Sequence, residues 1–152
     1  MTTTRSSRVV HALRTRVYAA LLDADAVQHW MVPDGMTSEV HEFDARTGGA
    51  FRISLTYDTP TGTGKTDAQT DSFHGTFAEL VPDTKVVQLV EFETDDPAMQ
   101  GRMRITYLLR DTDDGTLVEG THEDLPPGLD PDENELGWQM SMAKLAALVE
   151  PG

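Results

Sequence analysis

The pattern of apolar and polar positions divides the chain into a helical start, a long run of strands and a helical end. Apolar residues recur at helical spacing through residues 17–22, with no glycine or proline between them, which predicts a short helix. Asp23 or Asp25 can cap a second short helix that carries Trp30. Pro33 ends it, because proline cannot continue a helix.

Between residues 36 and 124, apolar and polar residues alternate with a period of two, which is typical of strands with one buried face. The segments concerned are 40–43, 51–57, 73–78, 86–93, 103–110 and 116–123. A short opening strand is expected at 6–11, and residues 113–115 favour a tight hairpin turn. Short connections between successive strands predict an antiparallel sheet. Residues 58–70 are polar and rich in glycine, so a mobile loop is expected there.

The last segment has the clearest helix start in the chain. Asp130 is expected as N-cap, Pro131 suits the first helical position, and Glu133 completes a capping-box pattern. One arc of this helix is expected to face the sheet, and it carries Trp138, Ser141, Met142, Leu145, Leu148 and Val149.

The order of elements predicts an α+β fold. We expect a curved antiparallel sheet of about six or seven strands that grips a long C-terminal helix, with two short helices near the N-terminus. The length of 152 residues suits one domain, 1–152. Where the curved sheet and the helix separate, a pocket in the size range of small-molecule sites is expected.

Composition excludes several classes of function. With 26 acidic and 12 basic residues the net charge is −14, so phosphate backbones should repel the chain and no nucleic-acid partner is expected. Apolar stretches fall far short of the ~20 residues that a membrane span needs, and no secretory signal stands at the start. We therefore expect a cytoplasmic protein with no membrane span.

The chain has no cysteine, which excludes disulfides, thiolate nucleophiles and cysteine-rich metal sites. The histidines in strand segments, His41, His74 and His122, lack the helical spacing of a metal pair. We expect no metal and no cofactor.

Four stretches of the chain carry a family resemblance, and they are residues 14–25 with His29-Trp30, 44–52, 75–82, and Gly137-Trp138. Their order and spacing resemble activator-of-heat-shock-ATPase-like proteins in the START-related helix-grip superfamily (SRPBCC), over roughly residues 8 to 150. The resemblance implies a hydrophobic ligand cavity. The superfamily contains lipid carriers, polyketide cyclases, hydrolases, hormone sensors and chaperone activators, so it implies no single catalytic residue set.

Inward-facing positions of the strands and helices are expected to line the pocket. The candidate ligand-binding residues are Trp30, Phe51, Tyr57, Phe73, Phe77, Gln88, Phe92, Met103, Tyr107, His122, Trp138 and Met142. Alternation in the last strand places His122 on the inner face, beside the space left by Gly120. Its imidazole can hydrogen-bond a ligand, act as a general base, or bond to neighbours and shape the core.

The leading hypothesis is a protein that binds a small hydrophobic or aromatic molecule. One alternative is an enzyme of the polyketide cyclase or hydrolase type that uses the same pocket, with His122 as its base. Another is a co-chaperone-like interaction module. The last helix has a second, weaker apolar stripe of Leu136, Met140, Ala143 and Ala147, which can pack on the sheet edge or in a homodimer.

Overall fold

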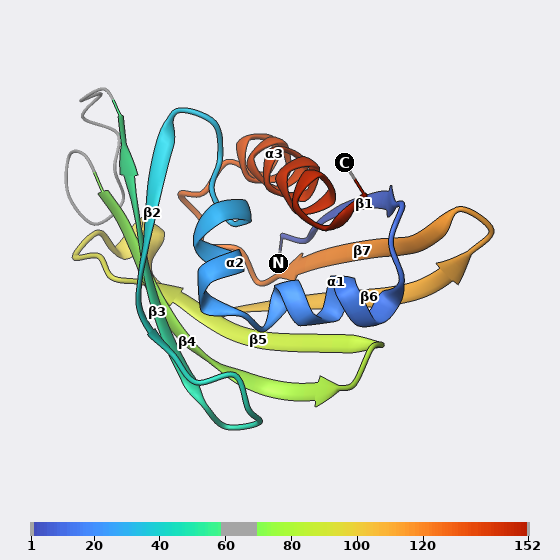
Figure 1. The fold of residues 1–152 in the computed structure, drawn as a ribbon. Coiled ribbons are helices and arrows are strands. Elements are labelled where there is room, and N and C mark those ends of the chain that lie inside the picture. The colour runs from blue at the N-terminus through green and yellow to red at the C-terminus, as the bar shows by residue number, and fades with distance from the viewer. Residues whose placement is uncertain (1, 59–69, 152) are drawn as a thin grey trace.

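A seven-stranded antiparallel sheet curls around three helices in this computed structural model, which describes residues 2–58 and 70–151 (Figure 1). The strands are β1 Thr4–Val10, β2 Met36–Phe43, β3 Ala50–Tyr57, β4 Thr70–Val81, β5 Lys85–Phe92, β6 Met103–Thr112 and β7 Gly115–Glu123. The helices are α1 Arg14–Leu21, α2 Ala24–Trp30 and α3 Pro131–Val149, with a short 3₁₀ helix at Pro97–Met99. The predicted α+β fold class is confirmed. The predicted mobile loop falls largely on residues 59–69, outside the described residues.

The strands lie in the order β1-β7-β6-β5-β4-β3-β2. From β2 to β7 each strand pairs with the next one in sequence, as expected for a meander. The exception is β1, which pairs with β7 and brings Thr4 opposite His122. The first and last strands of the chain are therefore neighbours at one edge of the sheet, where α3 also lies (Figure 1).

The sheet bends sharply between β5 and β3 (Figure 1). The pairing register shifts between Phe77 and Glu79 in β4, and a second shift lies in β2. Such irregularities bend a strand and increase its twist. At Gly75 the strands approach so closely that an added Cβ would overlap the backbone carbonyl of Leu89. Glycine is thus required where the sheet curves.

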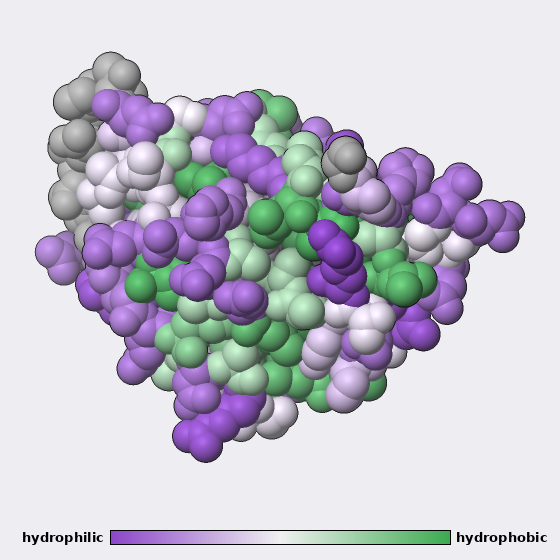
Figure 2. Space-filling view, in the orientation of Figure 1, coloured by the Kyte–Doolittle hydropathy of each residue, from purple (hydrophilic) through white to green (hydrophobic). Residues whose placement is uncertain are grey.

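The helices fill the hollow of the sheet (Figure 1). Asp23 caps α2, because its side chain accepts a hydrogen bond from the Asp25 amide at 3.0 Å. The last residue of that helix, Trp30, is fully buried, and its Nε1 donates to the Ala20 carbonyl at 2.9 Å. The two short helices are therefore joined through the core. Figure 2 shows hydrophobic residues gathered across the middle and lower part of this face, with hydrophilic residues between them and along most of its rim.

Helix α3 begins as predicted, with the Asp130 side chain accepting from the Asp132 amide at 2.9 Å. Its buried residues include Met142, Leu145 and Val149. The prediction for Leu148 was wrong, because this side chain is 43% exposed. It lies in a shallow surface depression beside α1 and α2, and Ala146 is buried in its place.

Two glycine-to-alanine substitutions should change stability in opposite directions, because one glycine lies where two strands approach closely and the other lies inside a helix. Gly75→Ala should destabilise the protein by about 1–3 kcal/mol, since the methyl group meets backbone that cannot move aside. Gly137→Ala, inside α3, should stabilise it by up to about 1 kcal/mol, because the nearest atom, Pro33 Cγ, is 3.7 Å from the new Cβ. Urea unfolding measures both changes. Equal stabilities for the two variants would contradict the role given to Gly75.

Candidate functional site

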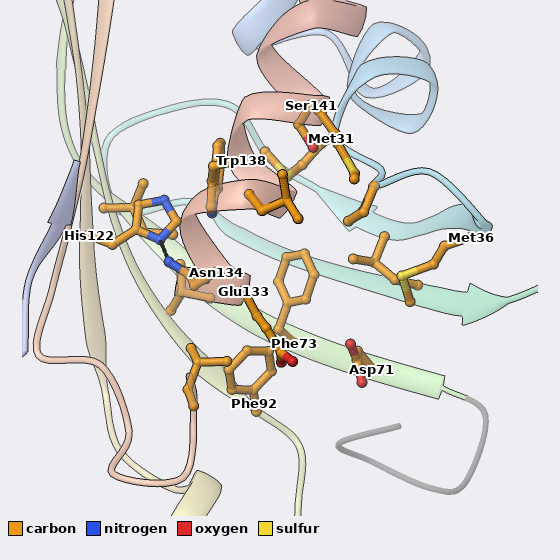
Figure 3. Close-up of a pocket in the computed structure, with 18 of the residues that line it drawn as sticks. Met31, Met36, Asp71, Phe73, Phe92, His122, Glu133, Asn134, Trp138 and Ser141 are labelled. Atoms are coloured by element: carbon orange, nitrogen blue, oxygen red, sulfur yellow. Dashed lines mark hydrogen bonds between the residues drawn. The ribbon is translucent and has the colours of Figure 1, made fainter. Parts of the chain in front are cut away.

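A pocket of about 330 Å³ lies between the concave face of the sheet and the first half of α3 (Figure 3). Most of the side chains around it are apolar or aromatic. The described residues that line it are Met31, Pro33, Asp34, Met36, Leu55, Tyr57, Asp71, Phe73, Gln88, Val90, Phe92, Met103, Ile105, His122, Leu129, Glu133, Asn134, Leu136, Gly137, Trp138, Met140 and Ser141.

The alternation of the strands explains the floor of the pocket. Gln88 is paired with Ile105, and Ile105 with His122, so neighbouring strands place these three side chains on one face. Further along the same face, Phe73 pairs with Phe92, and their rings meet edge to face with centroids 6.5 Å apart. The floor therefore has polar and apolar side chains at the end near His122 and aromatic side chains at the end near β4.

Seven of the predicted ligand-binding residues line this pocket, namely Tyr57, Phe73, Gln88, Phe92, Met103, His122 and Trp138. The other five, Trp30, Phe51, Phe77, Tyr107 and Met142, are buried in the core and do not line it. The period of two gives the face of each residue, but not whether a helix packs directly on it. Trp30 and Tyr107, for example, pack edge to face with ring centroids 6.3 Å apart.

Sequence reasoning missed several lining residues. Asp71 continues the inward alternation of Phe73 by two positions, a signal that was present in the sequence. Glu133 and Asn134 lie one helical turn before Gly137 and Trp138, so the helical period also contained them. The pocket residues between α2 and β2 stand in a connection with no periodic pattern, and nothing in the sequence indicated them.

His122 is held in place by α3 and β1. Asn134 Nδ2 donates to His122 Nδ1 at 3.0 Å and contacts Thr4 Oγ1 at the same distance. The imidazole meets the Trp138 ring edge to face, with centroids 4.3 Å apart. Met142 Cε occupies the space beside Gly120, where a Cβ would come within 2.9 Å of it. The free space expected beside Gly120 is therefore filled.

The electrostatic setting of His122 follows from its burial. Only 4% of the residue is exposed, and desolvation lowers the pKa of the imidazole from 6.5 to about 3. The ring is thus neutral near pH 7. Because Nδ1 accepts from Asn134, the proton lies on Nε2, which has no hydrogen-bond partner among the described residues. The basic nitrogen is already engaged, so this histidine is poorly suited to take a proton from a molecule in the pocket.

Residues 2–58 and 70–151 contain neither a metal-binding cluster nor a membrane-spanning helix. Among them, no cluster of three or more metal-ligating side chains could hold a metal ion. No helix in this part of the chain is both long enough and apolar enough to cross a membrane.

Fold and pocket together place the chain among helix-grip proteins, in which a curved antiparallel sheet encloses a C-terminal helix. Residues 11–150 match the family described as Activator of Hsp90 ATPase homolog 1-like protein. The chain belongs to this family, and the resemblance noted in the sequence is confirmed.

Solved structures agree with this assignment. A protein from Chromobacterium violaceum is 35% identical, with a TM-score of 0.87 over 99% of this chain and 98% of that one. An AHSA1 protein from Silicibacter pomeroyi is 18% identical, with a TM-score of 0.78 over 97% and 96% of the two chains, and therefore supports the fold alone. A comparison with curated proteins finds no match.

Replacing His122 should change how stability depends on pH. The folded-state pKa of about 3 lies below the ordinary 6.5, so between these values the unfolded chain binds one proton more. The free energy of unfolding therefore falls as the pH decreases, by about 1.4 kcal/mol per pH unit from this group. His122→Gln should remove that part of the slope, measured by urea unfolding at pH 7, 6 and 5.

The matched control is His41→Gln on β2, at an exposed position, which should keep the wild-type slope. An unchanged slope in His122→Gln would show that burial does not keep this imidazole neutral.

Proposed function

We propose that this chain binds a small, mostly apolar or aromatic molecule in the pocket between the sheet and α3. The observation that carries the proposal is the pocket itself, whose volume of about 330 Å³ lies in the size range of small-molecule sites. Its lining has the composition of such sites, with many apolar side chains and few polar ones.

The expected affinity follows from the area that a ligand could bury. A guest that removes about 200 Å² of apolar surface from water gains roughly 5 kcal/mol, before the costs of association are subtracted. Phe73, Phe92 and Trp138 offer ring faces and edges to an aromatic guest, which adds to this gain. A free energy of about 5 kcal/mol corresponds to a dissociation constant of about 0.2 mM, so a guest held mainly by apolar burial is expected to bind in the submillimolar to millimolar range.

An enzyme with His122 as general base is less well supported. The Nδ1 atom of this residue accepts from Asn134, and burial lowers its pKa to about 3. A general base works best with a pKa near the operating pH, and its lone pair must reach the substrate. Neither condition favours His122, whereas a role in holding Asn134 and α3 in position agrees with its contacts.

A protein-interaction module also has less support. Helix α3 exposes Leu136 (54%) and Leu148 (43%). They stand twelve positions apart, which corresponds to about 18 Å along a helix, so they do not form one continuous apolar patch. Leu136 also lines the pocket, so its exposure is explained by the pocket rim.

Filling the pocket tests the proposal. Val90 lies on its floor, while the adjacent Leu89 points to the opposite face of β5. Val90→Phe should weaken binding of the neutral fluorescent probe N-phenyl-1-naphthylamine at least about tenfold, because the added ring occupies the space of the guest. Leu89→Phe, the matched control, should bind the probe like the wild type in a fluorescence titration.

Native mass spectrometry after incubation with a metabolite extract gives an independent test. The wild-type protein should retain a small molecule that Val90→Phe does not retain. If no molecule is retained, and the probe binds neither protein or both equally, ligand binding in this pocket is refuted.

A further inference from the structure

The connection between α2 and β2, residues 31–35, forms one wall of the pocket. It contributes Met31, Pro33 and Asp34 to the lining, and Met36 follows at the start of β2. Figure 3 shows Met31 and Met36 on one side of the pocket. The other walls are formed mainly by strands and by α3. Because the connection is neither helix nor strand, no regular pattern of backbone hydrogen bonds holds this wall in place.

The pocket reaches the surface of the protein along this connection. Of the described lining residues, only Asp34, Glu133 and Leu136 are exposed. Asp34 belongs to the connection, and the other two belong to the first two turns of α3. Their neighbours Pro33 and Gly137 approach closely, because a Cβ added to Gly137 would lie 3.7 Å from Pro33 Cγ. The shortest way into the pocket for a guest is therefore between the connection and α3.

Lys144 of α3 joins the connection to the helix by two polar contacts. Its Nζ donates to the Val32 carbonyl at 2.7 Å and pairs with Asp34 Oδ1 at 3.2 Å. The hydrogen bond has a charged donor and is therefore the stronger contact, whereas the Asp34 side chain is 70% exposed and its ion pair adds less. In the part of the chain that the structure describes, no other side chain of α3 forms a hydrogen bond or an ion pair with this connection.

The two ends of the connection are fixed by other parts of the fold. At its start Met31 is buried in the hydrophobic core. At its end the Gly35 carbonyl accepts from the Asp58 amide at 2.8 Å. The φ of Gly35 is 82°, a conformation that glycine adopts without strain, so the chain can turn there. Residues 32–34 lie between these fixed points, and Lys144 provides their polar contacts with α3.

We infer that residues 31–35 move away from α3 to admit and release the guest, and that Lys144 is a positioning residue that holds them closed. This inference rests on the proposed function and concerns how the same pocket is entered. Lys144 is not among the described lining residues, so a bound guest need not disturb its contacts. The contacts break only while the connection is open, and they therefore slow association and dissociation alike.

Lys144→Met tests the inference, because methionine keeps an unbranched apolar side chain but has neither the charge nor the donor. The relaxation rate of N-phenyl-1-naphthylamine fluorescence after a temperature jump, measured at increasing protein concentration, gives kon from its slope and koff from its intercept. Both constants should rise at least about threefold, since a charged hydrogen bond no longer has to break in each exchange. The dissociation constant should change by less than about twofold, because the lost contacts are the same with and without guest.

Lys85→Met is the matched control. The Lys85 side chain is 32% exposed, as is that of Lys144, and it also pairs with a carboxylate, Glu79 Oε1 at 2.8 Å. It stands on β5 and is not among the lining residues. This variant loses the same charge and a similar ion pair, so it should keep both rate constants of the wild type.

A disulfide between the connection and α3 gives a second test that leaves Lys144 in place. The chain has no cysteine, so Pro33→Cys combined with Gly137→Cys allows only one intramolecular bond. The 3.7 Å between Pro33 Cγ and a Cβ at Gly137 indicates that the two sulfur atoms can meet. The oxidised protein should exchange the probe at least about tenfold more slowly than the reduced protein, because the connection can no longer separate from α3. Mass spectrometry after thiol labelling shows whether the bond has formed.

The outcomes separate this inference from the ligand-binding function. If the probe binds but Lys144→Met and Lys85→Met exchange it at equal rates, or if oxidation does not slow exchange, the inference is overturned and ligand binding stands. A weaker affinity of Lys144→Met with an unchanged kon would also overturn it, since Lys144 would then only shape the pocket. Failure of the two cysteines to pair would contradict the close approach of the connection to α3. If the probe binds to none of these proteins, both proposals are overturned.

Discussion

A cluster of aromatic rings holds α3 away from the floor of the sheet. Trp138 extends from α3 and packs against Trp30, Tyr107 and His122, with ring centroids 6.5, 5.5 and 4.3 Å apart. Beyond this cluster toward the C-terminus, α3 lies directly on the core through Leu145. The pocket lies on the N-terminal side of this cluster, between α3 and the inner face of β3 to β6. Rings are rigid and bulky, so one large side chain can set the spacing of two layers. The proposed binding function depends on this spacing.

The sequence predicted the inner face of the strands well, and its failures have identifiable causes. Gln88 and His122 both lie inward, because a strong period of two leaves little choice of face once one side is buried. Tyr107 is also inward, but Trp30 covers it, and that contact joins residues 77 positions apart in the sequence. Asp71 was missed because it stands where the strand meets a polar, glycine-rich segment. The period of two thus predicts on which face of the sheet a side chain lies. The distance between the sheet and the helices depends instead on contacts between residues that are far apart in the sequence.

His122 joins three parts of the fold rather than presenting a reactive group. It stands on β7, receives a hydrogen bond from Asn134 of α3, and through that amide is connected with Thr4 of β1. A buried polar network of this kind fixes a geometry, because each member loses its partner if another one moves. The N-terminal half of α3, which carries both Asn134 and Glu133, is held at a fixed place over the sheet. The wall of the pocket is therefore preorganised, which lowers the cost of ordering it around a guest.

The pairing of β1 with β7 has a consequence for how the chain is made. During synthesis Thr4–Val10 is made before its partner, Gly115–Glu123, which follows more than a hundred residues later. Until then the opening strand has an unsatisfied backbone edge, and α3, which covers the hollow, is still absent. Contacts between such distant segments form slowly, and transiently exposed edges favour aggregation. The edge between β1 and β7 can form only after β7 has been made, so a nascent chain that ends before Gly115–Glu123 carries β1 without its partner.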